Sequence, residues 1–165
     1  MFRIFVGYDE RESHAFDACV ESIYSNTVQS DYIAFPLIKE KITGFCREKY
    51  YPDEVVATDF AFSRFLVPRL CNYEGWALFC DCDFIFTRDI AELFALRNDD
   101  YSVMCVKHDY TCKDTVKMDN QKQIHFPRKN WSSCMLFNCS HPDCKNLSVD
   151  SVNKSSPAYL HQMKW

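Results

Sequence analysis

Short apolar runs separate polar segments along the chain, and one stretch has clear helical spacing. Phe2–Val6 and Tyr32–Ile38 are predicted strands, and Pro36 places the second at a sheet edge or a bulge because proline lacks a backbone donor. Strand, helix and strand in this order predict a parallel βαβ unit. The predicted helix presents this apolar face: Ala15, Phe16, Cys19, Val20, Ile23 and Tyr24.

The strongest predicted strand is Trp76–Cys80, an uncharged run typical of a strand buried on both faces. Asp81, Cys82 and Asp83 follow it directly. Because residues i and i+2 of an extended segment point to the same side, we expect the two carboxylates to lie together. Two close carboxylates repel unless a cation lies between them, and hard divalent cations prefer oxygen ligands. The motif therefore predicts a metal site at Asp81 and Asp83, whereas a turn or a helix cap is the structural alternative.

The remaining pattern predicts several shorter elements. Thr58–Pro68 is typical of a capped helix start that Pro68 would bend or end. Asp89–Phe94 predicts a short helix with Asp89 as its N-cap. Lys39–Glu54 and His108–Lys129 have no period and are predicted as irregular. Strands are further expected at Ser102–Val106 and Ser133–Phe137, short helices at Pro142–Leu147 and Val149–Lys154, and a final amphipathic segment at Leu160–Trp165.

Composition indicates one domain over residues 1–165 with a sizeable core, since 47% of the residues are apolar. The apolar chain end leads us to expect a further C-terminal segment in the natural protein. A net charge of -4 without a basic run argues against a nucleic-acid partner. No apolar stretch approaches the roughly 20 residues of a membrane span, and we find no signal peptide.

Ten cysteines raise the question of disulfides. Without a secretory signal, we expect reduced thiols in a cytoplasmic protein, which could also lie peripherally at a membrane. Cys80 and Cys82 alternate with the two aspartates and should point into the core, where free cysteine is common. Zinc is the alternative, although no C-x-x-C pair occurs. Its candidate ligand sets are Cys105, His108 and Cys112, or Cys139, His141 and Cys144.

A second candidate segment, Gly7-Tyr8-Asp9, follows the first strand. In open α/β sheets, ligands bind beyond the carboxyl ends of the strands, where both this segment and the two aspartates should lie. Gly7 would let a ligand approach the backbone closely. Tyr8 offers a ring face for stacking, with simple packing as the alternative, and Asp9 can accept hydrogen bonds from a base or a ribose.

Several segments together resemble GT-A glycosyltransferases, in particular glycosyltransferase family 8 and related enzymes of bacteria and large DNA viruses of the chlorella virus type. The resemblance implies an α/β fold whose central mixed, mostly parallel sheet is flanked by helices. It also implies a retaining transferase that uses Mn²⁺ or Mg²⁺ to move a hexose-type sugar from a nucleotide sugar, a UDP-sugar above all, to a glycan or other hydroxyl acceptor. The matching segments are Arg3–Asp9, Ala57–Pro68, Gly75–Asp83 with Asp89–Phe94, and Phe126–Ser133 with Met135–Asn138.

The resemblance also implies roles for individual residues. Asp83 would be the main metal ligand, Asp81 would touch the metal or the ribose, and Arg64 would pair with Asp81 and reach the donor. An ordinary surface arginine is the alternative for Arg64. His161 and Gln162 would lie near the reacting carbon, although a histidine satisfied within an apolar segment is the alternative. The donor site would further include Gly7, Tyr8 and Asp9 at the uracil end, Cys82, Asp59 and Lys129, and Asn130, Ser132 and Ser133 in the sugar pocket.

Three alternatives stay open. Inversion would need an acceptor-side base, for which Asp109, Asp114 and Asp119 remain candidates. A haloacid-dehalogenase-type phosphatase would also place D-x-D after a buried strand, with Asp81 as the nucleophile. A domain that binds a nucleotide sugar or glycan without turnover is the third, because family relatives usually supply a third metal ligand, a C-terminal histidine, that has no counterpart up to Trp165.

Overall fold

The computed structural model describes residues 1–28, 31–108, 127–128 and 130–165. In these residues five strands form one sheet in the order β2-β1-β3-β5-β4. β1 pairs in parallel with β2 and β3, whereas β5 pairs antiparallel with β3 and β4. Only β5 therefore runs against the other four strands, which confirms the predicted mixed sheet. The bounds are β1 Phe2–Gly7, β2 Tyr32–Leu37, β3 Trp76–Cys80, β4 Val103–Cys105 and β5 Cys134–Asn138.

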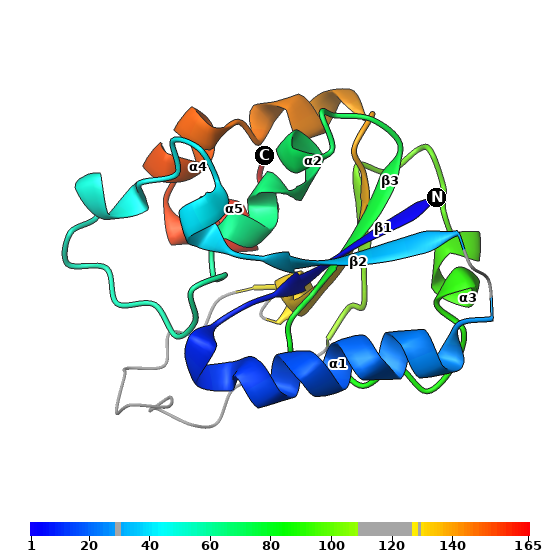
Figure 1. The fold of residues 1–165 in the computed structure, drawn as a ribbon. Helices are drawn as coiled ribbons and strands as arrows, with labels where there is room; N and C mark the ends of the chain where they lie inside the picture. The colour runs from blue at the N-terminus through cyan, green and yellow to red at the C-terminus, as the bar shows by residue number, and fades with distance from the viewer. Residues whose placement is uncertain (29–30, 109–126, 129) are drawn as a thin grey trace.

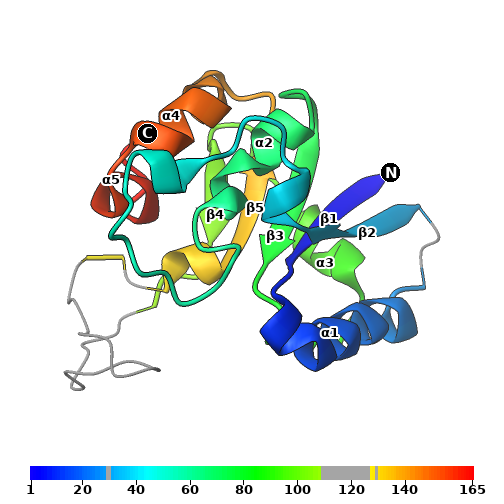
Figure 2. The same ribbon diagram turned by 60° about the vertical axis from the view of Figure 1, so that its left-hand side comes forward.

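Helices cover both faces of the sheet (Figures 1 and 2). On one face lie α1 (Ser13–Asn26) and α3 (Ile90–Ala95). On the other lie α2 (Val67–Leu70), α4 (Val149–Lys154) and α5 (Pro157–His161). None of the helices in the described residues is long and apolar enough to cross a membrane.

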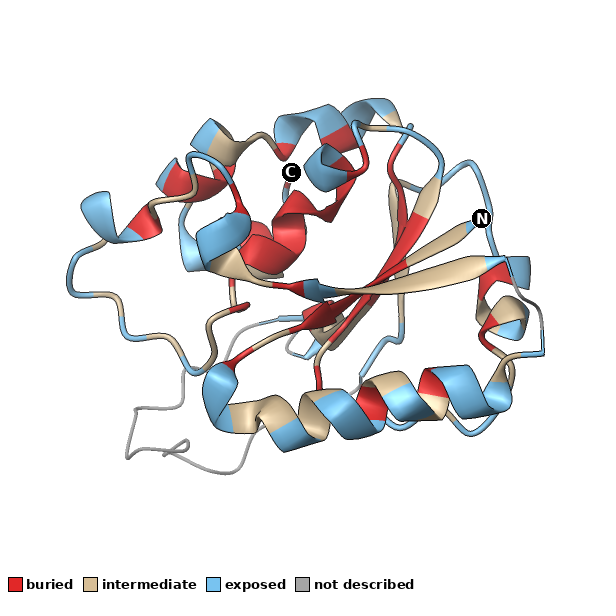
Figure 3. Ribbon diagram, viewed as in Figure 1, coloured by how far each residue is buried: buried red, intermediate tan, exposed pale blue. Residues whose placement is uncertain are grey.

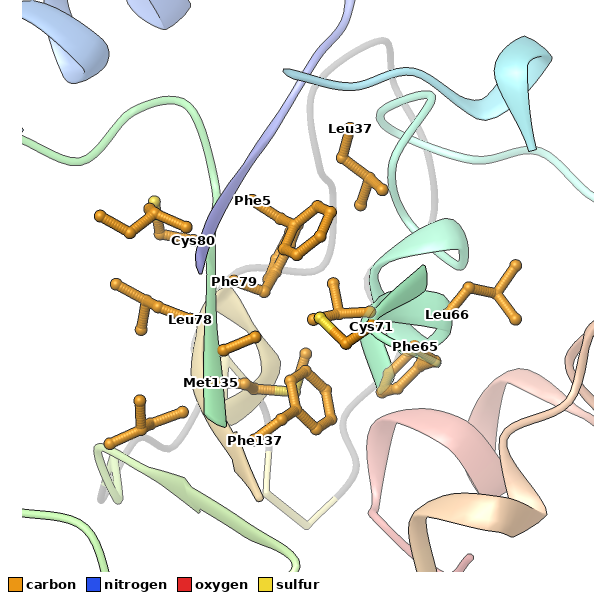
Figure 4. Close-up of a cluster of buried hydrophobic side chains, with 14 of the residues drawn as sticks. Phe5, Leu37, Phe65, Leu66, Cys71, Leu78, Phe79, Cys80, Met135 and Phe137 are labelled. Carbon is orange, nitrogen blue, oxygen red and sulfur yellow. The ribbon is translucent and has the colours of Figure 1, made fainter. Parts of the chain in front are cut away.

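The core lies on both sides of β3, as the uncharged run predicts (Figure 3). Figure 4 shows Phe79 facing Phe65 and Leu66 in the layer that contains α2. Leu78 and Cys80 project to the opposite side of the strand, where the Cys80 thiol meets the Cys19 thiol of α1 at 4.0 Å between the sulfur atoms. The side chains of β3 therefore anchor both helical layers.

The prediction of a helix from Thr58 is wrong in its start and in the role of Pro68. Residues 57–62 form bends and turns, and a 3-10 helix, η4, occupies Ser63–Leu66. Pro68 lies in the first turn of α2. A proline is tolerated there because the first helical N–H groups have no intrahelical acceptor anyway. Pro68 therefore belongs to a helix start and not to a helix end.

Other local predictions agree with the structure. β2 is an edge strand, which accommodates Pro36. Asp89 caps α3 by accepting a hydrogen bond from the Ala91 backbone N–H at 2.8 Å. The irregular segment 39–54 contains two 3-10 turns, and the short helix expected from Pro142 is the 3-10 helix Pro142–Asn146.

One element differs from the prediction. The sequence did not predict the helix α5 at Pro157–His161, which begins before the expected amphipathic segment Leu160–Trp165.

Most of the described cysteines are buried in the core. All nine are free of disulfides, and Cys80 and Cys82 are buried as predicted. Within the described residues, no group of three or more His, Cys, Asp or Glu side chains is arranged to hold a metal ion. The thiol of Cys144 instead meets the Asn138 carbonyl at 3.2 Å, and His141 caps a 3-10 helix. Cys112 lies outside the described residues.

Candidate functional site

The segments that follow β1 and β3 leave the sheet side by side. Val6 pairs with Cys80 in the parallel register, so Gly7 and Asp81 continue from neighbouring positions. The Asp81 backbone N–H also donates to the Ser133 carbonyl at 2.8 Å. This contact brings the 3-10 helix η6 (Trp131–Ser133), which precedes β5, to the same edge of the sheet. The predicted meeting of these segments is therefore present in the fold.

Arg64 in η4 is a buried residue whose charge faces Asp81. Its Nη1 atom lies 2.8 Å from Asp81 Oδ1 and donates to the Ser132 carbonyl at 2.8 Å. Its Nε atom donates to the Phe60 carbonyl at 3.1 Å. The guanidinium also lies over the rings of Phe60 and Phe79. The side chain of Arg64 is thus fixed from several directions, which excludes the interpretation as an ordinary surface arginine.

Asp81 remains incompletely satisfied despite this ion pair. Its Oδ1 atom is buried, and no donor among the described residues is aligned with it as a hydrogen bond, so Arg64 makes a charge contact. Burial raises the pKa of Asp81 to about 6, Arg64 opposes that rise, and the charges of Asp83 and Glu12 add to it. Burial also lowers the pKa of Arg64, an effect that Asp81 opposes.

These properties fit a divalent cation. A buried carboxylate oxygen whose one close cation is not aligned as a hydrogen-bond donor can also accept a hard cation, especially where a second acid follows two residues later. Asp83 is exposed and so remains accessible to a ligand. If the side chains of Asp81 and Asp83 held a metal, their carboxylate oxygens would suit Mn²⁺ or Mg²⁺ and not a thiol-preferring metal.

Cys82, between the two aspartates, has a partner within the protein. It is buried, and its thiol donates to Glu12 Oε2 at 3.1 Å. Burial and this contact both raise the pKa of the Cys82 thiol. Cys82 therefore connects the loop after β3 with the segment after β1. Glu12 was missed by the sequence analysis, although its place shortly after the first strand could have drawn attention to it.

Asp9 is buried, and protein groups occupy its carboxylate. It accepts hydrogen bonds from the Arg11 backbone N–H, Nε and Nη2, and from the Asp59 backbone N–H. The hydrogen bonds from Arg11 hold its pKa near 2, against the opposing effect of burial. Asp9 thus caps the 3-10 helix Glu10–Glu12. Both carboxylate oxygens of Asp9 already accept hydrogen bonds from the protein. A base or ribose that bound to Asp9, as expected from the sequence, would have to share these oxygens.

Gly7 and Tyr8 also have partners within the protein. A Cβ atom at Gly7 would lie 2.6 Å from the Phe60 ring. The close approach that Gly7 permits is therefore to Phe60, whereas the sequence led us to expect a ligand there. The ring of the half-buried Tyr8 packs edge-on against Phe16, with 5.2 Å between the ring centroids. This contact agrees with the alternative that Tyr8 packs within the protein.

The remaining candidates occupy different surroundings. Lys39 pairs with Asp59 at 2.5 Å, which connects the 3-10 turn Lys39–Lys41 with the segment before η4. Asn130 is exposed in a left-handed conformation, and its carbonyl accepts the Ser133 N–H and hydroxyl. Lys129 lies outside the described residues.

His161 and Ser132 join the group around Arg64. The Ser132 hydroxyl and His161 Nδ1 share a hydrogen bond of 2.9 Å. The structure therefore brings Asp81, Arg64, Ser132 and His161 together through direct contacts. Gln162 contacts its neighbours through its backbone: its carbonyl accepts from Arg128 Nη1 at 2.6 Å, and its N–H donates to the Ala158 carbonyl at 3.2 Å.

The chain resembles known proteins in both sequence and fold. No protein-family model matches it. It is 47% identical over 167 residues to Protein CDI of Arabidopsis thaliana, an alignment that covers 99% of this chain but 63% of that protein. The chain thus spans less than two thirds of this relative.

Two solved glycosyltransferases share the fold at low sequence identity. The apo structure of the bifunctional glycosyltransferase WbbM superposes with a TM-score of 0.59 and 13% identity, covering 91% of this chain and 34% of WbbM. The apo form of GlyE from Streptococcus pneumoniae TIGR4 has a TM-score of 0.53 and 15% identity, covering 92% of this chain and 36% of GlyE. The fold is therefore similar to that of glycosyltransferases.

Proposed function

We propose that residues 1–165 form the nucleotide-sugar-binding domain of a metal-dependent glycosyltransferase. The donor is a nucleotide sugar, best a UDP-sugar, and the acceptor is a hydroxyl of a glycan or a small molecule. The assignment of UDP, of a hexose and of retention rests on the resemblance to glycosyltransferase family 8.

One arrangement carries this proposal. Asp81 and Asp83 stand directly after the buried strand β3, and Asp81 has a buried oxygen without an aligned donor beside the buried Arg64. Ligands bind at the carboxyl ends of such strands. The similarity of the fold to WbbM and GlyE supports placing a sugar donor at this edge.

The side chains of the site have complementary roles in this proposal. Asp81 and Asp83 would hold Mn²⁺ or Mg²⁺, which when bound neutralises diphosphate charge as a Lewis acid. Arg64 holds Asp81 and supplies a permanent positive charge near the developing charge of the leaving diphosphate. Tyr8 and the loop around Asp9 border the place of the base, and Ser132 and Ser133 border that of the sugar.

A thermal-shift panel of nucleotides and nucleotide sugars, with and without Mn²⁺, tests the proposal. A ligand at one hundred times its dissociation constant stabilises the folded state by about 2.7 kcal/mol. We expect UDP to raise the melting temperature only with Mn²⁺, and Asp83→Ala to abolish this shift. The matched control is Asp100→Ala, which removes an exposed loop acid between α3 and β4 and should keep the full shift. A panel in which no nucleotide shifts the wild-type protein would contradict the donor-site assignment.

Binding without turnover is the second candidate, because the described residues hold no group of three or more His, Cys, Asp or Glu side chains that could surround a metal. A chain with binding only would show the Mn²⁺-dependent shift but would neither transfer nor hydrolyse the sugar. A phosphatase would instead hydrolyse a generic phosphate ester and lose that activity in Asp81→Asn. Measuring the release of UDP and of phosphate from the same preparation distinguishes the three activities.

A further inference from the structure

His161 lies between two segments that together hold the partner of Asp81. Its ring packs against Phe62 and Phe65, with centroids 5.4 and 5.2 Å away. These phenylalanines flank Arg64 closely in the sequence, and Phe65 shares η4 with it. On its other side, His161 Nδ1 meets the Ser132 hydroxyl of η6 at 2.9 Å. One side chain of α5 thus contacts both η4 and η6.

Ser132 continues this connection to the charged pair. Its side chain is buried and bonds to His161, whereas its carbonyl accepts from Arg64 Nη1 at 2.8 Å. The same Nη1 atom lies 2.8 Å from Asp81 Oδ1. The hydroxyl contact therefore restrains the peptide group that orients the guanidinium.

Asp81 also contacts η6 directly, through its backbone. Its backbone N–H donates to the carbonyl of Ser133, the residue after Ser132. Any displacement of η6 would therefore move both the backbone of Asp81 and the arginine that faces its carboxylate. Partners of this indirect kind fix the orientation of ligating side chains and tune their affinity for a metal.

From these contacts we infer that His161 is a positioning residue. It holds η6 and η4 together and thereby sets the place of Arg64 against Asp81. The inference rests on the proposed function, because its consequence is read at the metal and nucleotide site. It differs from the expectation that His161 acts beside the reacting carbon, since its effect passes through Ser132 and Arg64.

The test measures the affinity of the folded protein for Mn²⁺ in the presence of UDP, by electron paramagnetic resonance of the free ion. His161→Phe keeps a ring against Phe62 and Phe65 but removes Nδ1, and Ser132→Ala removes the hydroxyl. We expect each variant to bind Mn²⁺ about tenfold more weakly. Because both changes break the same contact, the double variant should be no weaker than either single variant.

Two further variants separate the contact from general stability. His161→Asn retains an amide that can reach the Ser132 hydroxyl, so its affinity for Mn²⁺ should stay close to that of the wild type. Ser140→Ala removes a hydroxyl that accepts from the Gly75 N–H at 2.7 Å, beyond the opposite end of β5. It makes the same chemical change as Ser132→Ala, and it should lower the melting temperature without altering Mn²⁺ affinity.

Each outcome identifies which idea fails. If the wild-type protein does not bind Mn²⁺ with UDP, the proposed function fails and the inference falls with it. If the wild type binds and His161→Phe binds equally well, only the inference is overturned, and a fall in kcat alone would place His161 at the reacting carbon. Additive losses in the double variant would also overturn it, because His161 and Ser132 would then act separately.

Discussion

Asp9 shows how a single carboxylate can couple the fold to pH. Its side chain is 1% exposed and receives four hydrogen bonds from Arg11 and Asp59. Its pKa falls from 3.8 to about 2 on folding. A carboxylate with a lowered pKa stabilises the folded state above its unfolded pKa, and this contribution disappears as the pH falls through the folded value.

We therefore expect Asp9→Asn to reduce the free energy of unfolding by about 1 to 2 kcal/mol at neutral pH. The difference from the wild type should shrink between pH 4 and pH 2, where the wild-type carboxylate takes up its proton. Urea denaturation at a series of pH values measures it. Asp53→Asn, at an exposed turn, serves as the control. A deficit that stays constant down to pH 2 would show that charge is not the cause.

At the level of residues, the sequence located the polar side chains at the strand ends better than it predicted their partners. The pair Asp81 and Asp83 could be found because two acids after a buried run are a local signal. The contact between Gly7 and Phe60 could not, because it joins positions that are distant in the chain. The occupation of Asp9 by Arg11 was also missed, since a carboxylate at a strand end looks alike whether its partner is a ligand or a nearby arginine.

At the level of elements, one arginine, Arg47, connects the irregular segment 39–54 to the layer of helices that contains α4. Arg47 pairs with Glu54 at 2.5 Å, and its Nη1 donates to the carbonyls of Val152 and Ser155 at 2.7 Å. Its guanidinium also lies 3.8 Å from the centroid of the Phe62 ring. A segment with little regular structure thus gains a fixed position from one buried charge.

Replacing Arg47 by Met should lower the free energy of unfolding by about 3 kcal/mol, because Glu54 would lose its buried partner. We also expect proteases to cleave within residues 39–54 before the rest of the chain. Arg88→Met is the matched control, since Arg88 and Glu92 form a surface pair in which both side chains are more than half exposed. That variant should lose less than about 1 kcal/mol. Equal losses in both variants would contradict the anchoring role of Arg47.

The elements themselves were largely predictable, but their arrangement was not. The apolar runs located all five described strands because burial leaves a local trace in each. Pro68 misled the prediction because the same residue marks either a helix start or a helix end. The antiparallel place of β5 between β3 and β4 has no local signal, since strand pairing depends on the whole sheet.

At the level of the whole molecule, the thiols report on the integrity of the core. Six of the nine described cysteines are buried and three are partly exposed. Alkylation requires an accessible thiolate, so buried thiols react only when the surrounding structure opens. We expect iodoacetamide to label Cys46 first in the native protein, and Cys105 and Cys134 more slowly, because burial raises the pKa of both thiols, that of Cys134 to about 12. The buried group should become labelled only on unfolding: Cys19, Cys71, Cys80, Cys82, Cys139 and Cys144.

Peptide mapping by mass spectrometry measures this pattern, and labelling in guanidinium provides the reference for complete reaction. The comparison of Cys80 with Cys46 is the most informative, because one lies at the end of β3 and the other in the irregular segment. Equal labelling rates for the two in the native protein would mean that the core opens far more readily than its packing implies.

The position of β5 also has a consequence for folding of the chain during its synthesis on the ribosome. As the chain emerges, β1, β2 and β3 can pair with one another, but one side of β3 then keeps its backbone groups unpaired until residues 134–138 have been synthesised. An open strand edge of this kind can recruit other chains. Nascent chains that stall before β5 are therefore the form of this protein in which we expect chaperones to be needed most.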